Sequence, residues 1–144
     1  SGQLSGTHAV AVNQSTVQYA FLSDGSNAVS LAPLPNAMTT TSFAINDNGW
    51  VVGGSTVAGT RPFVNRPDGQ GGRETINLGT FPNVSESSLG IALDINNGGT
   101  VVGRADTQWG MQHAFRALQD DQGNYGSLQD LGSFNGGWFH SGTS

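Results

Sequence analysis

The hydrophobic positions of this chain fall in short runs, and turns that contain glycine separate one run from the next. No segment shows the apolar period of about 3.6 residues that marks an amphipathic helix. Runs of good helix formers such as Lys, Glu and Ala are also missing. With 22 Gly and 5 Pro placed as turn residues, the pattern predicts an all-β fold with almost no helix.

One pattern of residues occurs twice, at positions 43–53 and again at positions 93–103. In each copy an apolar run ends in Ile-Asn, a glycine-bearing turn follows, and Val-Val-Gly comes next. Ile45 and Ile95 correspond, so the period is 50 residues (95 minus 45). Periods of about 20 to 50 residues are typical of repeat architectures. The turns suit Asn and Gly because both tolerate a positive φ at little cost.

Both copies then continue with a strand around a Phe and a strand that ends in Leu-Gly. These strands are Arg61-Pro62-Phe63 and Ile76-Asn77-Leu78-Gly79 in the first copy, and His113-Ala114-Phe115 and Gln129-Asp130-Leu131-Gly132 in the second. Each copy is therefore predicted to form a four-stranded antiparallel meander of about 50 residues, in a propeller-like or stacked-sheet arrangement. The positions expected to define the unit are Ile45, Asn46, Gly49, Gly53, Phe63, Ile95, Asn96, Gly99, Gly103, His113, Phe115, Leu131 and Gly132.

We expect a single all-β repeat domain over residues 1–144. Its predicted parts are a partial repeat at residues 1–41, full repeats at residues 42–90 and 91–132, and a carboxyl-terminal complementing strand at residues 133–144.

The partial repeat matches only the later strands of the unit. Residues 19–22 match the Phe strand, and residues 29–32 match the Leu-Gly strand. Residues 9–12 take the place of Val-Val-Gly in this interpretation, which leaves the opening strand missing. Residues 133–140 lie where the first strand of a next copy would begin.

These motifs resemble those of the HAF-type extracellular repeat family, whose units carry Ile-Asn-x-x-Gly-x-Val-Val-Gly, His-Ala-Phe and Asp-Leu-Gly stretches. The best match is at positions 95–103, 113–115 and 130–132, and the resemblance spans most of residues 42–139. It implies a bacterial protein that is secreted or attached to the cell surface, with a propeller-like β architecture and no catalytic residue to carry over. The first full copy has Arg61 where the family has His, which favours a packing role for His113.

The composition narrows the classes of partner. Charged residues make up 10% of the chain, the net charge is -5, and every basic residue is an arginine. Nucleic-acid binding needs a basic patch, so we exclude a nucleic-acid partner. No cysteine is present, and no apolar run approaches the roughly 20 residues of a membrane span. The first residue is Ser1 rather than Met, which indicates processing or trimming.

The candidates for metal binding are weak. His8, His113 and His140 lie at unrelated offsets without nearby carboxylate spacing, which is typical of surface or strand-edge histidines. Oxygen ligands that calcium accepts flank the repeated turn, at Asp47, Asn48, Asp94, Asn96 and Asn97. Turn chemistry explains the same residues without an ion, so we predict no cofactor and keep calcium as the open alternative.

No arrangement of residues indicates catalysis. Glu74 and Glu86 are the only glutamates, and Asp120-Asp121 lies in a polar stretch typical of a solvated loop. The Gly-x-Ser-x-Gly elbow of serine hydrolases is absent from the sequence. We therefore predict that the protein is not an enzyme.

Two aromatic residues are candidates for stacking on sugar rings, Trp109 and Tyr125. Trp109 lies in Thr107-Gln108-Trp109-Gly110, a stretch typical of an exposed loop, whereas Trp50 lies beside Val-Val-Gly and is expected to pack. A polysaccharide is therefore a possible partner.

The number of units leads to the functional prediction. Two full units and a split third are too few for a propeller of about four to eight blades, and repeat units bury their apolar faces against neighbours. We therefore expect self-association, through Ala9, Val10, Ala11, Val12, Phe134, Trp138 and Phe139. The predicted function is a secreted or cell-surface structural protein that forms a filament or layer by strand complementation between termini. The alternative is an extracellular carbohydrate-binding or adhesion module.

Overall fold

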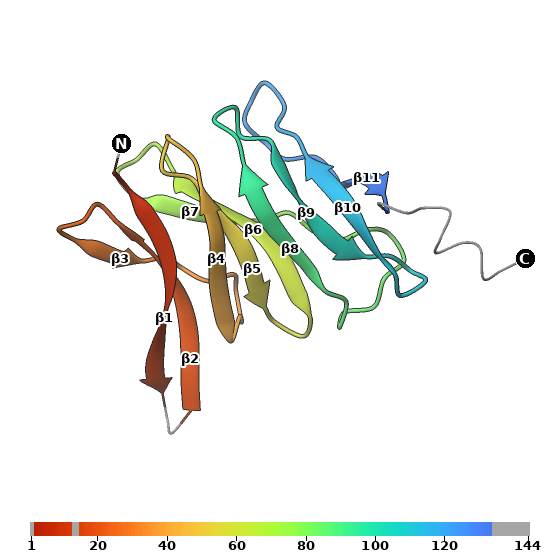
Figure 1. The fold of residues 1–144 in the computed structure, drawn as a ribbon, viewed down its shortest axis with the longest axis horizontal. Helices are drawn as coiled ribbons and strands as arrows, with labels where there is room; N and C mark the ends of the chain where they lie inside the picture. The colour runs from red at the N-terminus through yellow and green to blue at the C-terminus, as the bar shows by residue number, and fades with distance from the viewer. Residues whose placement is uncertain (1, 13–14, 134–144) are drawn as a thin grey trace, which may run out of the picture.

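A computed structural model of the chain describes residues 2–12 and 15–133. Within these ranges the protein is all-β, with eleven strands in three antiparallel sheets and no helix (Figure 1). The first sheet holds β1 (Leu4–Val12), β2 (Ser15–Ser23) and β3 (Ala28–Ser30). The middle sheet holds β4 (Thr39–Ile45), β5 (Val51–Thr56), β6 (Thr60–Pro67) and β7 (Arg73–Asn77), and the third holds β8 (Gly90–Ile95), β9 (Val101–Asp106), β10 (Gln112–Ala117) and β11 (Gln129–Gly132). No helix that could cross a membrane occurs in the part of the chain described.

The three sheets lie face to face, with the sheet β4–β7 between the other two (Figure 1). One apolar core fills the space between the first and middle sheets, and it includes Ala20, Leu22, Val51 and Phe63. A second core lies between the middle and third sheets. Its members include Val52, Val64, Ala92, Val101, Phe115 and Ala117. The middle sheet therefore buries both of its faces, and each outer sheet buries one.

The burial pattern along the strands follows from this layering. All of the first five residues of β5 are buried, as expected for a strand covered on both faces. In β9 and β10 buried residues alternate with exposed or half-buried ones, because only one face of the third sheet is covered. Val51, Val52 and Val101 together with Phe115 favour the strand conformation at covered positions, whereas Gly, Ser or Ala fill most of the other covered positions.

A β-bulge occurs at the same place in the two four-stranded sheets. In β4 the pairing with β5 skips Phe43, and in β8 the pairing with β9 skips Leu93. The bulge brings the backbone close to the glycine of Val-Val-Gly. A Cβ at Gly53 would lie 1.9 Å from the carbonyl oxygen of Thr41, and a Cβ at Gly103 would lie 2.1 Å from that of Ile91. Only glycine fits at these two positions.

The first sheet differs in register from the prediction. Gly53 pairs with Phe63 and Gly103 pairs with Phe115, and in the first sheet the same cross-strand pair is Gly6 and Phe21. Leu4-Ser5-Gly6, rather than residues 9–12, therefore occupies the position of Val-Val-Gly. Residues 9–12 pair with residues 15–18 at the far end of the β1–β2 hairpin, which extends past the other strands as an arm (Figure 1).

The linkers between sheets also contribute to the cores. Leu31 and Leu34 of the first linker are buried in the first core, and Leu78 and Phe81 are buried in the second. Both linkers then turn at an asparagine with positive φ, 63° at Asn36 and 61° at Asn83.

The predicted boundary between residues 41 and 42 falls inside β4, which begins at Thr39. The predicted boundary between residues 90 and 91 falls after the first residue of β8.

Because the strands of each sheet alternate in direction, the loops gather at two opposite ends of the strands. The turns that contain asparagine, at residues 46–50 and 96–100, lie at one end, which we call the turn end. The linkers and the β9–β10 turn lie at the other, the linker end.

Candidate functional site

The outward face of the third sheet is the first candidate site. Val52 and Val64 of the middle sheet are fully buried, but Val102 and Arg116 at the corresponding positions of the third sheet are exposed. Leu78 is 4% exposed, whereas the corresponding Leu131 is 53% exposed. The face that the middle sheet buries is therefore open on the third sheet among the described residues.

Two arginines cross this open face. Arg104 Nη1 donates to Gln112 Oε1 (2.6 Å), and Arg116 Nε donates to Gln129 Oε1 (2.6 Å). Val102 pairs directly with Arg116, which places the two side chains on the same side of the sheet. The outward face therefore combines apolar side chains with guanidinium groups that the amide partners orient.

The outward face of the first sheet is aromatic. The cross-strand pairs His8–Tyr19 and Gly6–Phe21 lie on one face, and the His8 ring centroid is 6.2 Å from that of Tyr19 and 6.1 Å from that of Phe21. His8 Nε2 is hydrogen-bonded to Ser30 Oγ (2.8 Å). These residues surround a shallow hollow lined by His8, Phe21, Ala28 and Ser30.

The edge of β1 is the strand edge that the sequence predicted to self-associate. In the sheet order β1-β2-β3, no strand of the described residues pairs with the outer side of β1. Ala9, Val10 and Ala11 are exposed along it. Of the other predicted residues, the strand position of Val12 is described, and Phe134, Trp138 and Phe139 lie outside the described residues.

The Asn-containing turns of the middle and third sheets interlock at the turn end. Asn46 Oδ1 accepts from the backbone N–H of Asn48 (3.0 Å) and Trp50 (2.9 Å), and its Nδ2 donates to the carbonyl oxygen of Asn96 (2.9 Å). Asn97 Nδ2 donates to Asp47 Oδ2 (2.8 Å), and Asn97 Oδ1 accepts from the N–H of Asp47 (2.9 Å). Of the residues proposed as calcium ligands, Asp47, Asn48 and Asn97 thus join one sheet to the next, and Asn96 takes part through its backbone carbonyl.

Asp94 and Asn96 form hydrogen bonds within their own segment, and calcium stays an open prediction. Asp94 Oδ1 accepts from the N–H of Ile95 (2.9 Å), and Asn96 Oδ1 accepts from that of Thr100 (2.9 Å). Over the residues that the structure describes, no three His, Cys, Asp or Glu side chains gather at a point where they could hold an ion.

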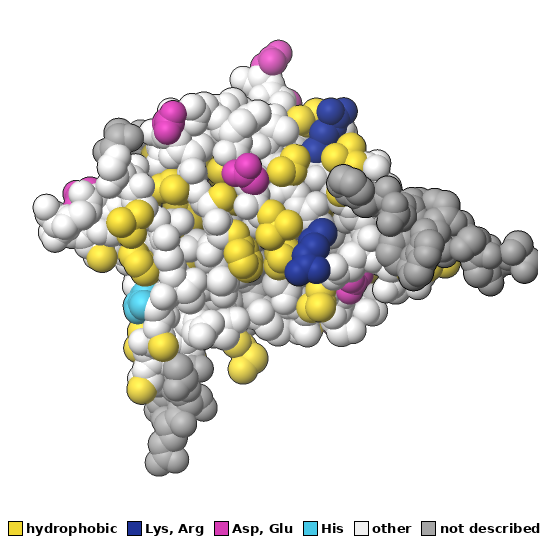
Figure 2. Space-filling view, viewed as in Figure 1, with side chains coloured by type: hydrophobic (Ala, Val, Ile, Leu, Met, Phe, Trp, Pro, Cys, Tyr) yellow, Lys and Arg dark blue, Asp and Glu magenta, His cyan; other side chains and the backbone are white. Residues whose placement is uncertain are grey.

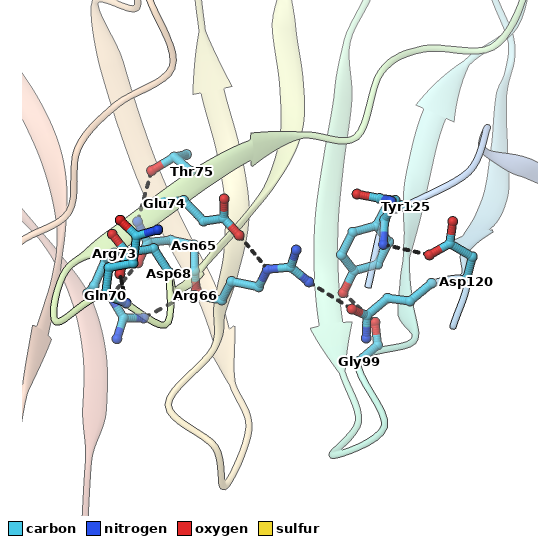
Figure 3. Close-up of polar contacts among 12 residues, drawn as sticks. Asn65, Arg66, Asp68, Gln70, Arg73, Glu74, Thr75, Gly99, Asp120 and Tyr125 are labelled. Atoms are coloured by element: carbon cyan, nitrogen blue, oxygen red, sulfur yellow. Dashed lines mark hydrogen bonds and ion pairs between the residues drawn. The ribbon is translucent and has the colours of Figure 1, made fainter. Parts of the chain in front are cut away.

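Arg66 joins the middle and third sheets near the same turns (Figure 3). Its Nε lies 2.8 Å from Glu74 Oε1, and its Nη1 donates to Gln119 Oε1 (2.7 Å). The guanidinium carbon is 5.1 Å from the Trp50 ring centroid and 5.9 Å from that of Tyr125, within the range of cation–π contacts. Arg66 therefore connects groups on both sides of the gap between the two sheets.

Tyr125 also belongs to this connection between the two sheets. Its hydroxyl donates to the carbonyl oxygen of Gly99 (2.5 Å), and its ring packs against the second core. Burial raises the pKa of Tyr125 to about 12, although the charge of Arg66 opposes the rise. Tyr125 follows β10 at the turn end, whereas Trp109 precedes β10 at the linker end. The structure does not bring the two predicted sugar-stacking residues together.

His113 is buried and packs in the third sheet beside Asp130. His113 Nδ1 lies 2.9 Å and 3.0 Å from the two carboxylate oxygens of Asp130, and Asp130 Oδ1 accepts from the N–H of Gly132 (2.7 Å). Burial by itself raises the pKa of Asp130. The bond from Gly132 and the contact with His113 outweigh burial, and they hold this pKa below its usual value.

The surface as a whole carries few charges. On the face shown in Figure 2, few side chains are charged, and hydrophobic side chains form small separate patches among other side chains and backbone. Trp109 is the most exposed of the large hydrophobic side chains described, with 70% of its surface accessible.

Sequence reasoning missed two groups of residues that position these sites. The linker pairs Leu31–Leu34 and Leu78–Phe81 precede Pro-Asn in both linkers, at an offset of 47 (78 minus 31), so a second repeated motif was present in the sequence. For Arg66 no local signal existed, because its partner Gln119 is 53 residues away.

No protein-family model, curated protein or solved structure matches the chain. The resemblance to HAF-type repeats therefore stays a prediction from the motifs.

Proposed function

We propose that the protein is a secreted or cell-surface structural protein whose copies associate head to tail into a filament or layer. In this arrangement the outward face of the third sheet packs on the outward face of the first sheet of another copy. One observation carries the proposal: Val102 and Leu131 are exposed, while Val52 and Leu78 at the corresponding positions are buried under the next sheet.

The side chains of the middle and third sheets face the neighbouring sheets in the same way, which supports packing of the third sheet of one copy on the first sheet of another. Phe63 and Phe115 both point toward the preceding sheet, and Val52 and Val64 point toward the following one. The first sheet exposes the face that receives a preceding sheet, and the third exposes the face that receives a following one. We propose that the three sheets are successive units of about 50 residues in a propeller-like array, as in HAF-type repeats.

The chemistry of the two faces is complementary. The third sheet presents Arg104 and Arg116, and the first presents the rings of Tyr19 and Phe21. Guanidinium groups stack favourably on aromatic faces, and contact with Val102 adds apolar burial. A contact between two different faces of identical chains is heterologous, so it produces a ring when it closes and a fibre when it does not.

Sedimentation velocity over a range of concentrations tests the face-to-face contact. The wild-type mass should rise with concentration, and both Val102→Asp and Tyr19→Asp should remain monomeric while keeping the wild-type circular dichroism spectrum. Met38→Asp is the matched control, because Met38 is an exposed apolar side chain on a linker. A wild-type protein that stays monomeric, or variants that assemble like the wild type, would contradict the proposal.

Mixing the two variants tests the head-to-tail geometry. Each variant keeps one intact face, so a mixture of Val102→Asp and Tyr19→Asp should give a one-to-one dimer and nothing larger. If the third sheets instead packed on each other, Tyr19→Asp alone would form dimers, and the heterologous arrangement would be wrong.

We further propose that residues 133–144 pair with the open edge of β1, which is strand complementation between termini. In the full chain, replacing Phe134, Trp138 and Phe139 together by serine should abolish assembly. Wild-type assembly of this variant would remove strand complementation and leave the contact between faces.

A further inference from the structure

The β9–β10 turn holds Trp109 away from the protein in a defined conformation. The N–H of Thr107 donates to the carbonyl oxygen of Met111 (2.7 Å), and the N–H of Gly110 donates to that of Thr107 (3.0 Å). The hydroxyl of Thr107 also donates to the carbonyl of Met111 (2.9 Å), and Gly110 has a φ of 78°. Thr107 is buried, whereas Trp109 is 70% exposed. Hydrogen bonds therefore close the backbone of the turn, and the indole is exposed to solvent.

Two hollows flank this turn on the linker side. The first is lined by Phe81, Pro82, Leu128, Asp130 and residues 107–109. The second is lined by Asn83, Val84, Ser85, Ser87, Ser88, Asp106, Thr107, Gln108 and Gly110. Both hollows include Thr107 and Gln108, so they adjoin along the groove between the turn and the linker at residues 78–89.

The two hollows differ in chemistry. The first is lined by the apolar side chains of Phe81, Pro82 and Leu128 beside Trp109, and Asp130 also lines it. The second is lined mainly by hydroxyl and amide groups together with Asp106. No described basic side chain lines either hollow. The groove therefore offers one aromatic surface, many uncharged hydrogen-bonding groups and two carboxylates that accept hydrogen bonds.

This set of groups fits a neutral oligosaccharide. The C–H face of a sugar ring is apolar and packs on an indole, while its hydroxyls donate to carboxylate and amide oxygens. An anionic polymer would meet the charges of Asp106 and Asp130, which disfavour its binding. We propose that the groove binds a neutral polysaccharide, with one ring on Trp109 and neighbouring units along the hydroxyl-lined hollow.

The middle sheet contains the corresponding hollow without the tryptophan. It is lined by Leu34, Pro35, Val57, Ala58, Arg61, Asn77 and Glu86. Leu34-Pro35 corresponds to Phe81-Pro82, and Asn77 corresponds to Asp130. The β5–β6 turn is shorter and carries Ala58, and Arg61 replaces His113. The aromatic surface is therefore specific to the third sheet and is not required for the packing of a unit.

Affinity electrophoresis through gels that contain a soluble polysaccharide tests the proposal. The neutral probes are mixed-linkage β-glucan, galactomannan and xylan, and polygalacturonate is the anionic probe. At least one neutral probe should retard the wild-type protein, and polygalacturonate should not. Trp109→Ala should weaken the affinity for the retarding probe by about tenfold or more. Met38→Ala, which changes an exposed apolar side chain away from the groove, should migrate like the wild type.

Three results would overturn the proposal: no retardation by any neutral probe, equal retardation of Trp109→Ala and wild type, or stronger retardation by polygalacturonate. A variant of the polar hollow, Gln108→Ala, should weaken retardation while leaving the fold unchanged by circular dichroism. If this variant were retarded as strongly as the wild type, the polysaccharide would contact the indole alone. That result would contradict binding along the hydroxyl-lined hollow.

Sedimentation velocity of Trp109→Ala separates the groove from the self-association faces. The variant should assemble like the wild type, because Trp109 lies on the β9–β10 turn and not on the outward face of the third sheet. If Trp109→Ala assembled less and its retardation were unchanged, the groove would be a contact between copies. The proposed self-association would survive, and the sugar site would not.

Discussion

The middle and third sheets share strand order, bulge position and turn bonds, but they differ in what covers them. Val64 of the middle sheet is fully buried, whereas Arg116 occupies the corresponding position of the third. Asn46 is buried under the neighbouring turn, and Asn96 is exposed. The glycines and aromatic residues shared by the two sheets therefore form the unit itself, whereas the residues at the outward positions of each strand differ according to whether another sheet covers them.

The largest effect should come from the feature that both sheets share. Gly53→Ala and Gly103→Ala would each force a Cβ against a backbone carbonyl oxygen, so each should destabilise the protein by about 3 kcal/mol or more. Urea unfolding measures the loss. Gly126→Ala is the matched control, because no atom lies within 4 Å of its added Cβ and its φ is not positive. Equal stability of Gly103→Ala and Gly126→Ala would show that the bulge is not tight.

The next effect should separate the two sheets. Val52→Ala removes a fully buried side chain and should cost about 2 kcal/mol. Val102→Ala changes a side chain that is 41% exposed and should cost less than about 0.5 kcal/mol at low concentration. Urea unfolding of dilute protein is the measurement. If the two variants lost equal stability, Val102 would already be covered within one chain.

A smaller difference should follow from the asparagines of the turns. Asn46→Asp removes the donor to the carbonyl of Asn96 and should cost about 1–2 kcal/mol. Asn96→Asp keeps the acceptor for Thr100, and no described residue receives a bond from Asn96 Nδ2, so its stability should change little. Thermal unfolding of both variants measures the difference in stability. An equal loss of stability would contradict a stabilising role for the bond from Asn46 to the carbonyl of Asn96.

The smallest effect concerns pH, because solvent screening weakens the contribution of the partly buried Tyr125. Because the folded pKa of Tyr125 is raised to about 12, its stabilisation is fully present below the ordinary pKa of about 10. It is lost as the pH rises from about 10 to about 12, since the unfolded state releases its proton first. Tyr125→Phe should therefore lose less stability over this interval than the wild type in urea unfolding. Parallel pH profiles would indicate that Tyr125 is not buried between the middle and third sheets.

The sequence was sufficient to predict the all-β class, and the structure confirms it, because the alternation of short apolar runs and glycine turns is local information. The first sheet was harder. Ala9 to Val12 resembles a Val-Val-Gly strand in hydropathy, but Gly6 is the residue that lies opposite Phe21. Cross-strand register depends on which residues face each other, and hydropathy along one strand does not contain that information.

Among the candidate site residues, some could be predicted from local sequence and others could not. Trp109 could be singled out because an aromatic residue between polar residues and glycine is exposed by local rules. The separation of Trp109 from Tyr125 could not be predicted, since it depends on the direction of β10. The contact of Arg66 with Gln119 requires two sheets to be stacked at a given offset, which no single segment encodes.

Each buried linker pair follows directly in the chain after a sheet that it covers, so it is synthesised before the next sheet. Leu78 and Phe81 emerge directly after β7, before any residue of the third sheet has been made. A nascent middle sheet thus receives apolar cover for its forward side from the next few residues that leave the ribosome. The linker pairs therefore reduce the apolar surface that the first and middle sheets expose before the next sheet has been made.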